Sequence, residues 1–196
     1  LFINVLVEPP VSDTYVVSFT IESLGAAPED VTLTPATSPL VFTGTSGRFE
    51  LVPVDDPIWE PTESFAITLT GVGPNATLGA LTRHEHSIED NDAPPTVNFA
   101  PVPSFDEGIG FVTVQLEASN PSAFAIDFDV QVLFTSTATD GDDYVLPITG
   151  GTFPAGTTSF EFDVEIVDDL LFERDETIVL QVTVLQGGST GEDNVA

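Results

Sequence analysis

The sequence has 196 residues and no cysteine, which excludes disulfide bonds and thiolate metal sites. Basic residues are almost as scarce, because Lys and Arg together number 3 against 32 Asp and Glu, for a formal net charge of −29. Without a basic patch to displace counterions from phosphates, nucleic-acid binding is excluded. Anionic membranes are disfavoured for the same reason, and no apolar run approaches the roughly 18 residues of a membrane-spanning helix.

The sequence also lacks a recognisable catalytic centre. An enzyme needs a nucleophile with its base, or two carboxylates of divergent pKa in a cleft. There is neither Cys nor Lys, and no histidine accompanies a plausible nucleophilic serine. The many acids could serve a glycosidase, but they come in clusters that repeat along the chain. We therefore expect this protein not to be an enzyme.

The apolar residues indicate an all-β fold. They make up 41% of the chain, with 15 Phe and many Val, Ile and Thr. Apolar and polar residues alternate with the period of a half-buried strand, and turn residues bound each such segment. No segment has sustained helical spacing. The sequence predicts antiparallel, immunoglobulin-like β-sandwiches, with strands at 65–69, 112–116, 126–132, 160–166 and 178–182.

The chain contains an internal repeat. Residues 55–63 recur as 168–176, at an offset of 113, and the same offset relates Asp30 to Asp143. Upstream, the best match pairs Val5 with Val114, at an offset of 109. The repeat predicts two tandem domains rather than one.

A proline-containing connection separates the two predicted domains. We expect domain one to span 1–92, the linker 93–95 and domain two 96–196, because two prolines end strand pairing there. Leu1 is not an initiator methionine, so we expect the numbering to begin inside a longer or processed chain.

Acidic residues gather where the predicted strands end. In domain two they are Glu107, Asp143, Asp168, Asp169, Glu173 and Glu176. Ca²⁺ takes six to eight oxygen ligands in flexible geometry, and loops that converge at one pole of a sandwich can supply them. Since close carboxylates repel one another, a cluster present in both repeats favours a bound cation over a surface that is acidic for solubility alone.

These motifs resemble the Calx-beta domains of sodium/calcium exchangers, an integrin subunit and many bacterial surface proteins. The resemblance rests on the Phe-Asp-Glu-Gly stretch at 105–108, Gly-Asp-Asp-Tyr at 141–144, and the acidic stretches 55–63, 89–92 and 168–176. It implies Ca²⁺ as the cofactor. It also implies that domain one lacks its first strand and domain two its last, so each repeat is short of some ligands.

The resemblance further implies a ligand set in each domain. In domain one the ligands would be Asp30, Asp55, Asp56, Glu60, Glu63, Asp90, Asn91 and Asp92. In domain two they would be Glu107, Asp143, Asp168, Asp169, Glu173 and Glu176.

We expect a calcium-binding structural or adhesive module of a secreted or cell-surface protein, located outside the cell, in which Ca²⁺ stiffens the domain junctions. Expected partners are neighbouring repeats, copies of the same protein in an extracellular filament, or a surface protein or glycan. The alternative is the cytosolic calcium-sensing domain pair of a sodium/calcium exchanger.

Three further features have two interpretations each. His84 and His86 could hold a transition metal but lack a third ligand, so solvated histidines are favoured. Asn75 begins a glycosylation sequon that also suits an ordinary turn. Trp59 and Phe172 share one repeat position, where each is expected to anchor its acidic loop on the core rather than bind a ligand.

Overall fold

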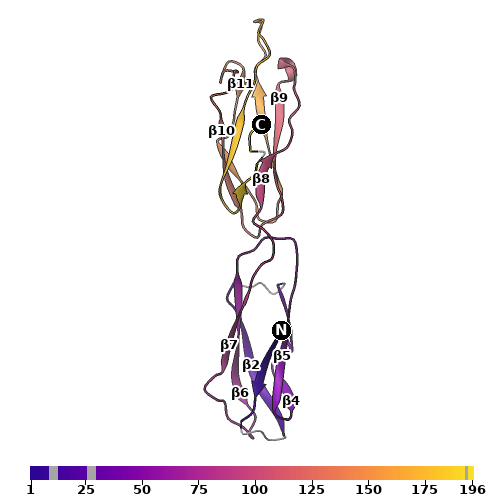
Figure 1. The fold of residues 1–196 in the computed structure, drawn as a ribbon. Coiled ribbons are helices and arrows are strands. Elements are labelled where there is room, and N and C mark those ends of the chain that lie inside the picture. Colours follow the sequence, from indigo (N-terminus) through magenta and orange to yellow (C-terminus); the bar gives the residue numbers. More distant parts are fainter. Residues whose placement is uncertain (9–12, 26–29, 193) are drawn as a thin grey trace. The chain divides into compact units, whose positions relative to one another are not determined.

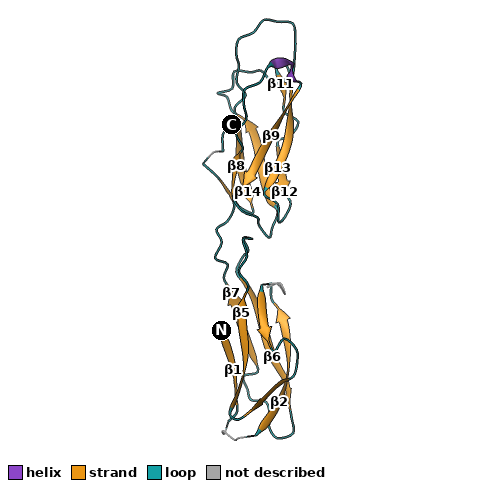
Figure 2. Cartoon of the chain, turned by 90° about the vertical axis from the view of Figure 1, so that its right-hand side faces the viewer, coloured by secondary structure: helices purple, strands orange, loops and turns teal. Residues whose placement is uncertain are grey.

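The computed structural model describes residues 1–8, 13–25, 30–192 and 194–196. The described chain consists of strands and loops with one short 3-10 turn, η1 (Glu107–Ile109), and no helix in it is long and apolar enough to span a membrane (Figure 2). It divides into two compact units. Unit 1 comprises Leu1–Asp56 and Pro61–Asp90, and unit 2 comprises Pro57–Glu60 and Asn91–Ala196.

Unit 1 is a sandwich of two antiparallel sheets (Figure 1). One sheet has the strand order β1-β5-β3 and the other the order β4-β2-β6-β7. The strands are β1 (Phe2–Leu6), β2 (Thr14–Ser23), β3 (Val31–Thr34), β4 (Leu40–Thr43), β5 (Ser46–Pro53), β6 (Glu63–Val72) and β7 (Arg83–Ile88).

Unit 2 is a second sandwich, with sheets in the orders β12-β10-β14 and β11-β13-β9-β8-β15. Its ladders are antiparallel except for the short parallel pairing of β15 with β8. The strands are β8 (Thr96–Phe99), β9 (Phe111–Ala118), β10 (Ile126–Val132), β11 (Tyr144–Val145), β12 (Gly150–Phe153), β13 (Ser159–Ile166), β14 (Leu180–Gln186) and β15 (Ser189–Thr190).

Alternation along the strands explains how each sandwich encloses a core. In β13, Phe162, Val164 and Ile166 are buried while the acidic residues between them are exposed. Phe49 and Leu51 of β5 follow the same pattern in unit 1. Burial of each such side chain contributes roughly 1.5 to 3 kcal/mol. The all-β prediction of two sandwiches is confirmed, although β14 begins at Leu180 rather than at residue 178.

The strand ladders of the two units correspond. The pairing of Val31 with Pro53 in unit 1 matches that of Tyr144 with Ile166 in unit 2, which preserves the offset of 113. The register of β1 differs from the one that the sequence alignment gave. Phe49 of β5 pairs with Ile3 of β1, whereas its counterpart in unit 2, Phe162 of β13, pairs with Val114 of β9. The structural offset there is 111, not 109. A two-residue slip leaves every side chain on the same face, so alternation alone could not detect it.

Candidate metal centre

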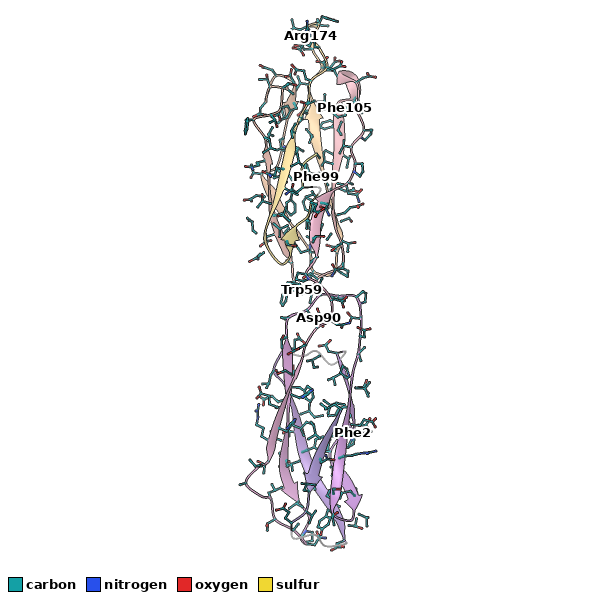
Figure 3. All side chains as sticks on the ribbon, viewed as in Figure 1. Phe2, Trp59, Asp90, Phe99, Phe105 and Arg174 are labelled. Carbon is teal, nitrogen blue, oxygen red and sulfur yellow. The ribbon has the colours of Figure 1, made fainter. Side chains whose placement is uncertain are left out.

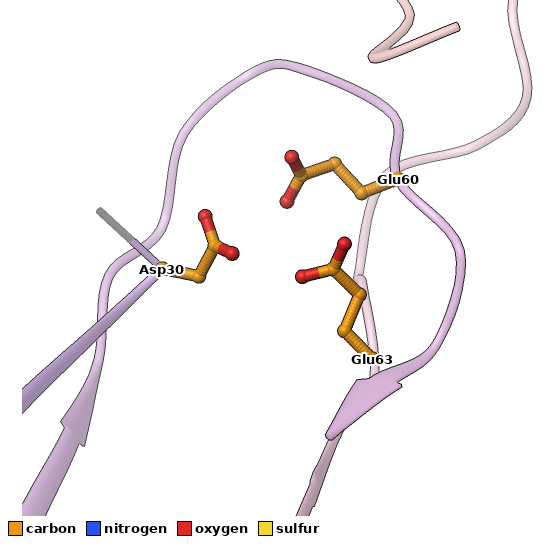
Figure 4. A group of neighbouring side chains, drawn as sticks. All are labelled: Asp30, Glu60 and Glu63. Carbon is orange, nitrogen blue, oxygen red and sulfur yellow. The ribbon is translucent and has the colours of Figure 1, made fainter. Parts of the chain in front are cut away.

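Three carboxylates meet near the starts of β3 and β6. Asp30 directly precedes β3, Glu63 opens β6, and Glu60 lies in the loop that joins β5 to β6. One oxygen from each of these side chains lies within 4.8 Å of the other two (Figure 4). Asp30 is only 7% exposed, and the two glutamates are half-buried. We call this group the carboxylate triad.

Backbone hydrogen bonds fix the loops that carry the triad. The Val54 amide donates to the Asp30 carbonyl at 2.8 Å, which joins the end of β5 to the start of β3. The Leu24 amide donates to the Ser64 carbonyl at 2.8 Å, which holds the end of β2 against β6. Gly25 follows with φ of 120°, a conformation that favours glycine. Two triad residues are thereby held at the start of rigid strands.

The geometry and chemistry of the triad suit a hard divalent cation. Ca²⁺ binds oxygen at about 2.3 to 2.6 Å, so opposite ligands lie up to about 5 Å apart, and the 4.8 Å spread of the triad falls within that limit. The donors are all oxygen, which favours Ca²⁺ over metals that prefer nitrogen or sulfur. Three carboxylates this close repel one another strongly unless a cation lies among them.

The other predicted ligands of domain one follow the ends of β5 and β7 and lie outside the triad. Asp55 and Asp56 are exposed after the end of β5. Asp90 and Asp92 are half-buried and Asn91 is exposed, all after the end of β7. Their carboxylates are not within the 4.8 Å group that the described residues form. Their role as ligands stays a prediction.

The predicted ligands of domain two gather at one pole of unit 2. Glu107 lies in η1 and accepts a hydrogen bond from the Asp169 amide at 3.3 Å. Asp143 accepts one from the Thr139 amide at 2.5 Å. The loop that continues from β13 carries the other predicted ligands, which are exposed: Asp168, Asp169, Glu173 and Glu176.

The acids at this pole of unit 2 affect one another's pKa values. Partial loss of hydration and then the negative charges of Asp143 and Asp169 raise the pKa of Glu173. Loss of hydration and a hydrogen bond with Asp143 raise the pKa of Glu176. Asp142 also acts on Glu173. Sequence reasoning missed Asp142, although its place in the Gly-Asp-Asp-Tyr stretch was a usable signal.

The model of the Calx-beta domain family matches residues 90–195, which lie almost entirely in unit 2. The chain belongs to the Calx-beta domain family. Unit 1 repeats two strand pairings of the matched sandwich, because β1 pairs with β5 as β9 pairs with β13, and β3 pairs with β5 as β11 pairs with β13. No curated protein matches the sequence.

Solved structures that resemble the chain include Calx domains. A crystal structure of CBD12 from CALX1.2 is 17% identical, with coverage of 93% of this chain and 72% of that chain and a TM-score of 0.42. The calcium binding domain CBD12 of CALX1.1 is 17% identical over 98% and 76%, with a TM-score of 0.41. The apo-form Calx CBD1 domain is 24% identical over 46% and 80%, with a TM-score of 0.40.

One expectation about the Calx-beta loops was wrong. Phe172 does not anchor its acidic loop, because its side chain is 98% exposed. The loop projects from the end of unit 2, where Figure 3 labels Arg174, so the ring has no core within reach. Trp59 is half-buried and its ring lies edge-on to Phe124, with centroids 6.3 Å apart.

His84, His86 and Asn75 do not belong to the carboxylate triad. His84 and His86 stack on β7 with ring centroids 6.3 Å apart, and they belong to no group of three potential ligands among the described residues. Asn75 lies in a turn and donates from its amide to an Asp13 carboxylate oxygen at 2.9 Å. That hydrogen bond is the largest of the effects that lower the pKa of Asp13.

The raised pKa values predict how metal-free unit 2 responds to acid. A carboxyl group whose pKa is higher in the folded state destabilises the fold when ionised, and this cost disappears as the pH falls through the folded pKa. We expect the wild type to gain more stability than Glu176→Gln between about pH 7 and about pH 5 in EDTA. Urea denaturation across this pH range measures the difference.

A matched control separates this local effect from general charge loss. Glu165→Gln removes one carboxylate from the outward face of β13, so its pH profile should follow that of the wild type. Superimposable profiles for the wild type and Glu176→Gln would contradict the expectation.

Proposed function

We propose that this protein is a Calx-beta calcium-binding module in which the carboxylate triad of Asp30, Glu60 and Glu63 binds Ca²⁺. The observation that supports the proposal is the meeting of three carboxylate oxygens within 4.8 Å of one another, one of them from a side chain only 7% exposed. Such a group is costly without a cation, because like charges repel most strongly where water is excluded.

Bound Ca²⁺ would offset two of the three negative charges of the triad and complete its oxygen shell with backbone carbonyls or water. Asp30 would contribute from the start of β3, and Glu63 from the start of β6. Because these strands belong to different sheets, joint ligation would link the two layers of the sandwich. The ion would therefore stabilise the fold rather than take part in a reaction.

Calorimetric titration with Ca²⁺ tests this proposal. Glu60→Gln/Glu63→Gln keeps the size of both side chains but removes two charges, so at least one binding event should be lost. Asp163→Asn/Glu165→Gln is the control, because it removes the same charge from the outward face of β13 and should leave the binding stoichiometry intact. Equal losses in both variants would mean that Ca²⁺ responds only to diffuse negative charge.

The setting of the module is part of the proposal. We place it in a secreted or cell-surface protein, where an extracellular module needs a Kd of only about 10⁻⁴ to 10⁻³ M. The absence of lysine and the Pro94-Pro95 connection support a surface array, with neighbouring repeats or copies as partners and Ca²⁺ as a stiffening ion. No catalytic step is assigned to it.

A further inference from the structure

Glu60 is the member of the carboxylate triad that lies within a loop, whereas the other two lie at or next to the start of a strand. The residue before it, Trp59, is hydrogen-bonded through both its amide and its carbonyl. The Trp59 amide donates to the Pro121 carbonyl at 2.9 Å, and the Ala123 amide donates to the Trp59 carbonyl at 2.9 Å. These residues all lie in unit 2, which includes the segment Pro57–Glu60. The backbone that leads into Glu60 is therefore fixed.

The segment that bonds Trp59, residues 121–124, is itself held in place. Ser122 is only 1% exposed, and its hydroxyl accepts a hydrogen bond from the Phe124 amide at 3.0 Å. The Ser122 carbonyl accepts another from the Gly156 amide at 2.8 Å, which joins the segment to the loop between β12 and β13. The Phe124 ring lies edge-on to the Trp59 ring. Trp59 thus packs on a segment that has its own hydrogen bonds to the sandwich.

The second repeat carries the same acids on a loop whose aromatic residue is not packed. The acids at the positions of the triad, 113 residues later, are Asp143, Glu173 and Glu176. Phe172 precedes Glu173 as Trp59 precedes Glu60, but its side chain is 98% exposed. These three acids form no group of carboxylates within 4.8 Å in the part of the chain that the structure describes. The compact arrangement of acids therefore accompanies the packed aromatic residue.

We propose that Trp59 is a positioning residue for calcium binding, because its attachment to segment 121–124 holds the Glu60 carboxylate within the triad (Figure 4). The inference rests on the proposed calcium site. A ligand that is held in place before the ion arrives loses less conformational entropy on binding. If the attachment is broken, only a fraction of the molecules present Glu60 correctly, and the apparent Kd rises by the inverse of that fraction. Segment 121–124 would then control Ca²⁺ affinity although it carries no charged side chain.

The fluorescence of Trp59 is the probe for this inference, because it is the only tryptophan in the chain and adjoins Glu60. We expect Ca²⁺ to change the Trp59 emission of the whole chain in a saturable way, and EDTA to reverse the change. Glu60→Gln/Glu63→Gln should abolish the response. Calorimetric titration of the same samples measures Ca²⁺ binding independently of the tryptophan.

The matched variants are Ala123→Pro and Ala123→Ser, both of which keep the tryptophan. Proline lacks the amide that donates to the Trp59 carbonyl, whereas serine retains it. We expect Ala123→Pro to raise the Kd for Ca²⁺ by about tenfold, which corresponds to about 1.4 kcal/mol and is within the usual contribution of one hydrogen bond. Ala123→Ser should leave the Kd within about twofold of the wild type. Phe124→Ala, with Phe124→Tyr as its control, repeats the test through the ring contact without changing a backbone amide.

An unchanged Kd in folded Ala123→Pro and Phe124→Ala would overturn the positioning role and leave the calcium proposal intact. Lower stability of these variants in EDTA, with the Kd unchanged, would assign Trp59 a structural role only. Equal weakening by Ala123→Pro and Ala123→Ser would also contradict the inference, since serine keeps the hydrogen bond. Absence of calorimetric binding by the wild type would instead remove the proposed function, and this inference with it.

Discussion

A hundredfold excess of Ca²⁺ over its Kd is expected to stabilise the triad-bearing fold by about 2.7 kcal/mol. For a unit of this size, each kcal/mol shifts the melting temperature by about 4 to 8 °C, so we expect a rise of roughly 10 to 20 °C relative to EDTA. The physical reason is that the folded state gathers Asp30, Glu60 and Glu63 within 4.8 Å, whereas the unfolded chain holds no such site.

Two controls separate ligation from screening in the melting experiment. Sodium chloride at equal ionic strength screens the carboxylates but does not coordinate them, so it should give a much smaller shift. Mg²⁺ should also act weakly, because it requires octahedral geometry with shorter bonds. An equal shift in all three salts would contradict specific binding.

Phe128→Ala is expected to destabilise unit 2 by about 3 to 5 kcal/mol. Phe128 is 1% exposed, and its ring contacts those of Phe153 and Phe160 at centroid distances of 5.5 and 5.0 Å. Truncation would leave a cavity at the centre of the core. Denaturant unfolding, with hydrogen exchange to assign the loss to unit 2, measures the effect.

Phe134→Ala is the matched control for Phe128→Ala. Its side chain is 98% exposed, so removal of the ring should change the free energy of unfolding by less than about 0.5 kcal/mol. Similar destabilisation in both variants would show that the aromatic cluster is not the centre of the core.

Strand alternation made the fold predictable from sequence. Residues 160–166 alternate so regularly that burial follows the pattern residue by residue in β13. The repeat seen in the sequence is also present in the structure, because the β3–β5 ladder of unit 1 recurs as the β11–β13 ladder of unit 2. The register of β1 was not predictable, since a slip of two residues changes no side-chain face.

The composition of the candidate site was predictable, but its geometry was not. The resemblance to Calx-beta domains implied Asp30, Glu60 and Glu63 as ligands together with neighbouring acids, and the repeat relates these positions to acids of domain two. Loops have no periodicity, so sequence could not show that these three meet while Asp55 and Asp56 lie outside the triad. The exposure of Phe172 was missed for the same reason.

The most direct test of the calcium proposal is a crystal structure grown with Ca²⁺, in which anomalous scattering locates the ion. The account predicts an anomalous peak among the carboxylates of Asp30, Glu60 and Glu63, with metal–oxygen distances of about 2.3 to 2.6 Å. No peak at the triad in crystals that contain Ca²⁺ elsewhere on the chain would contradict it.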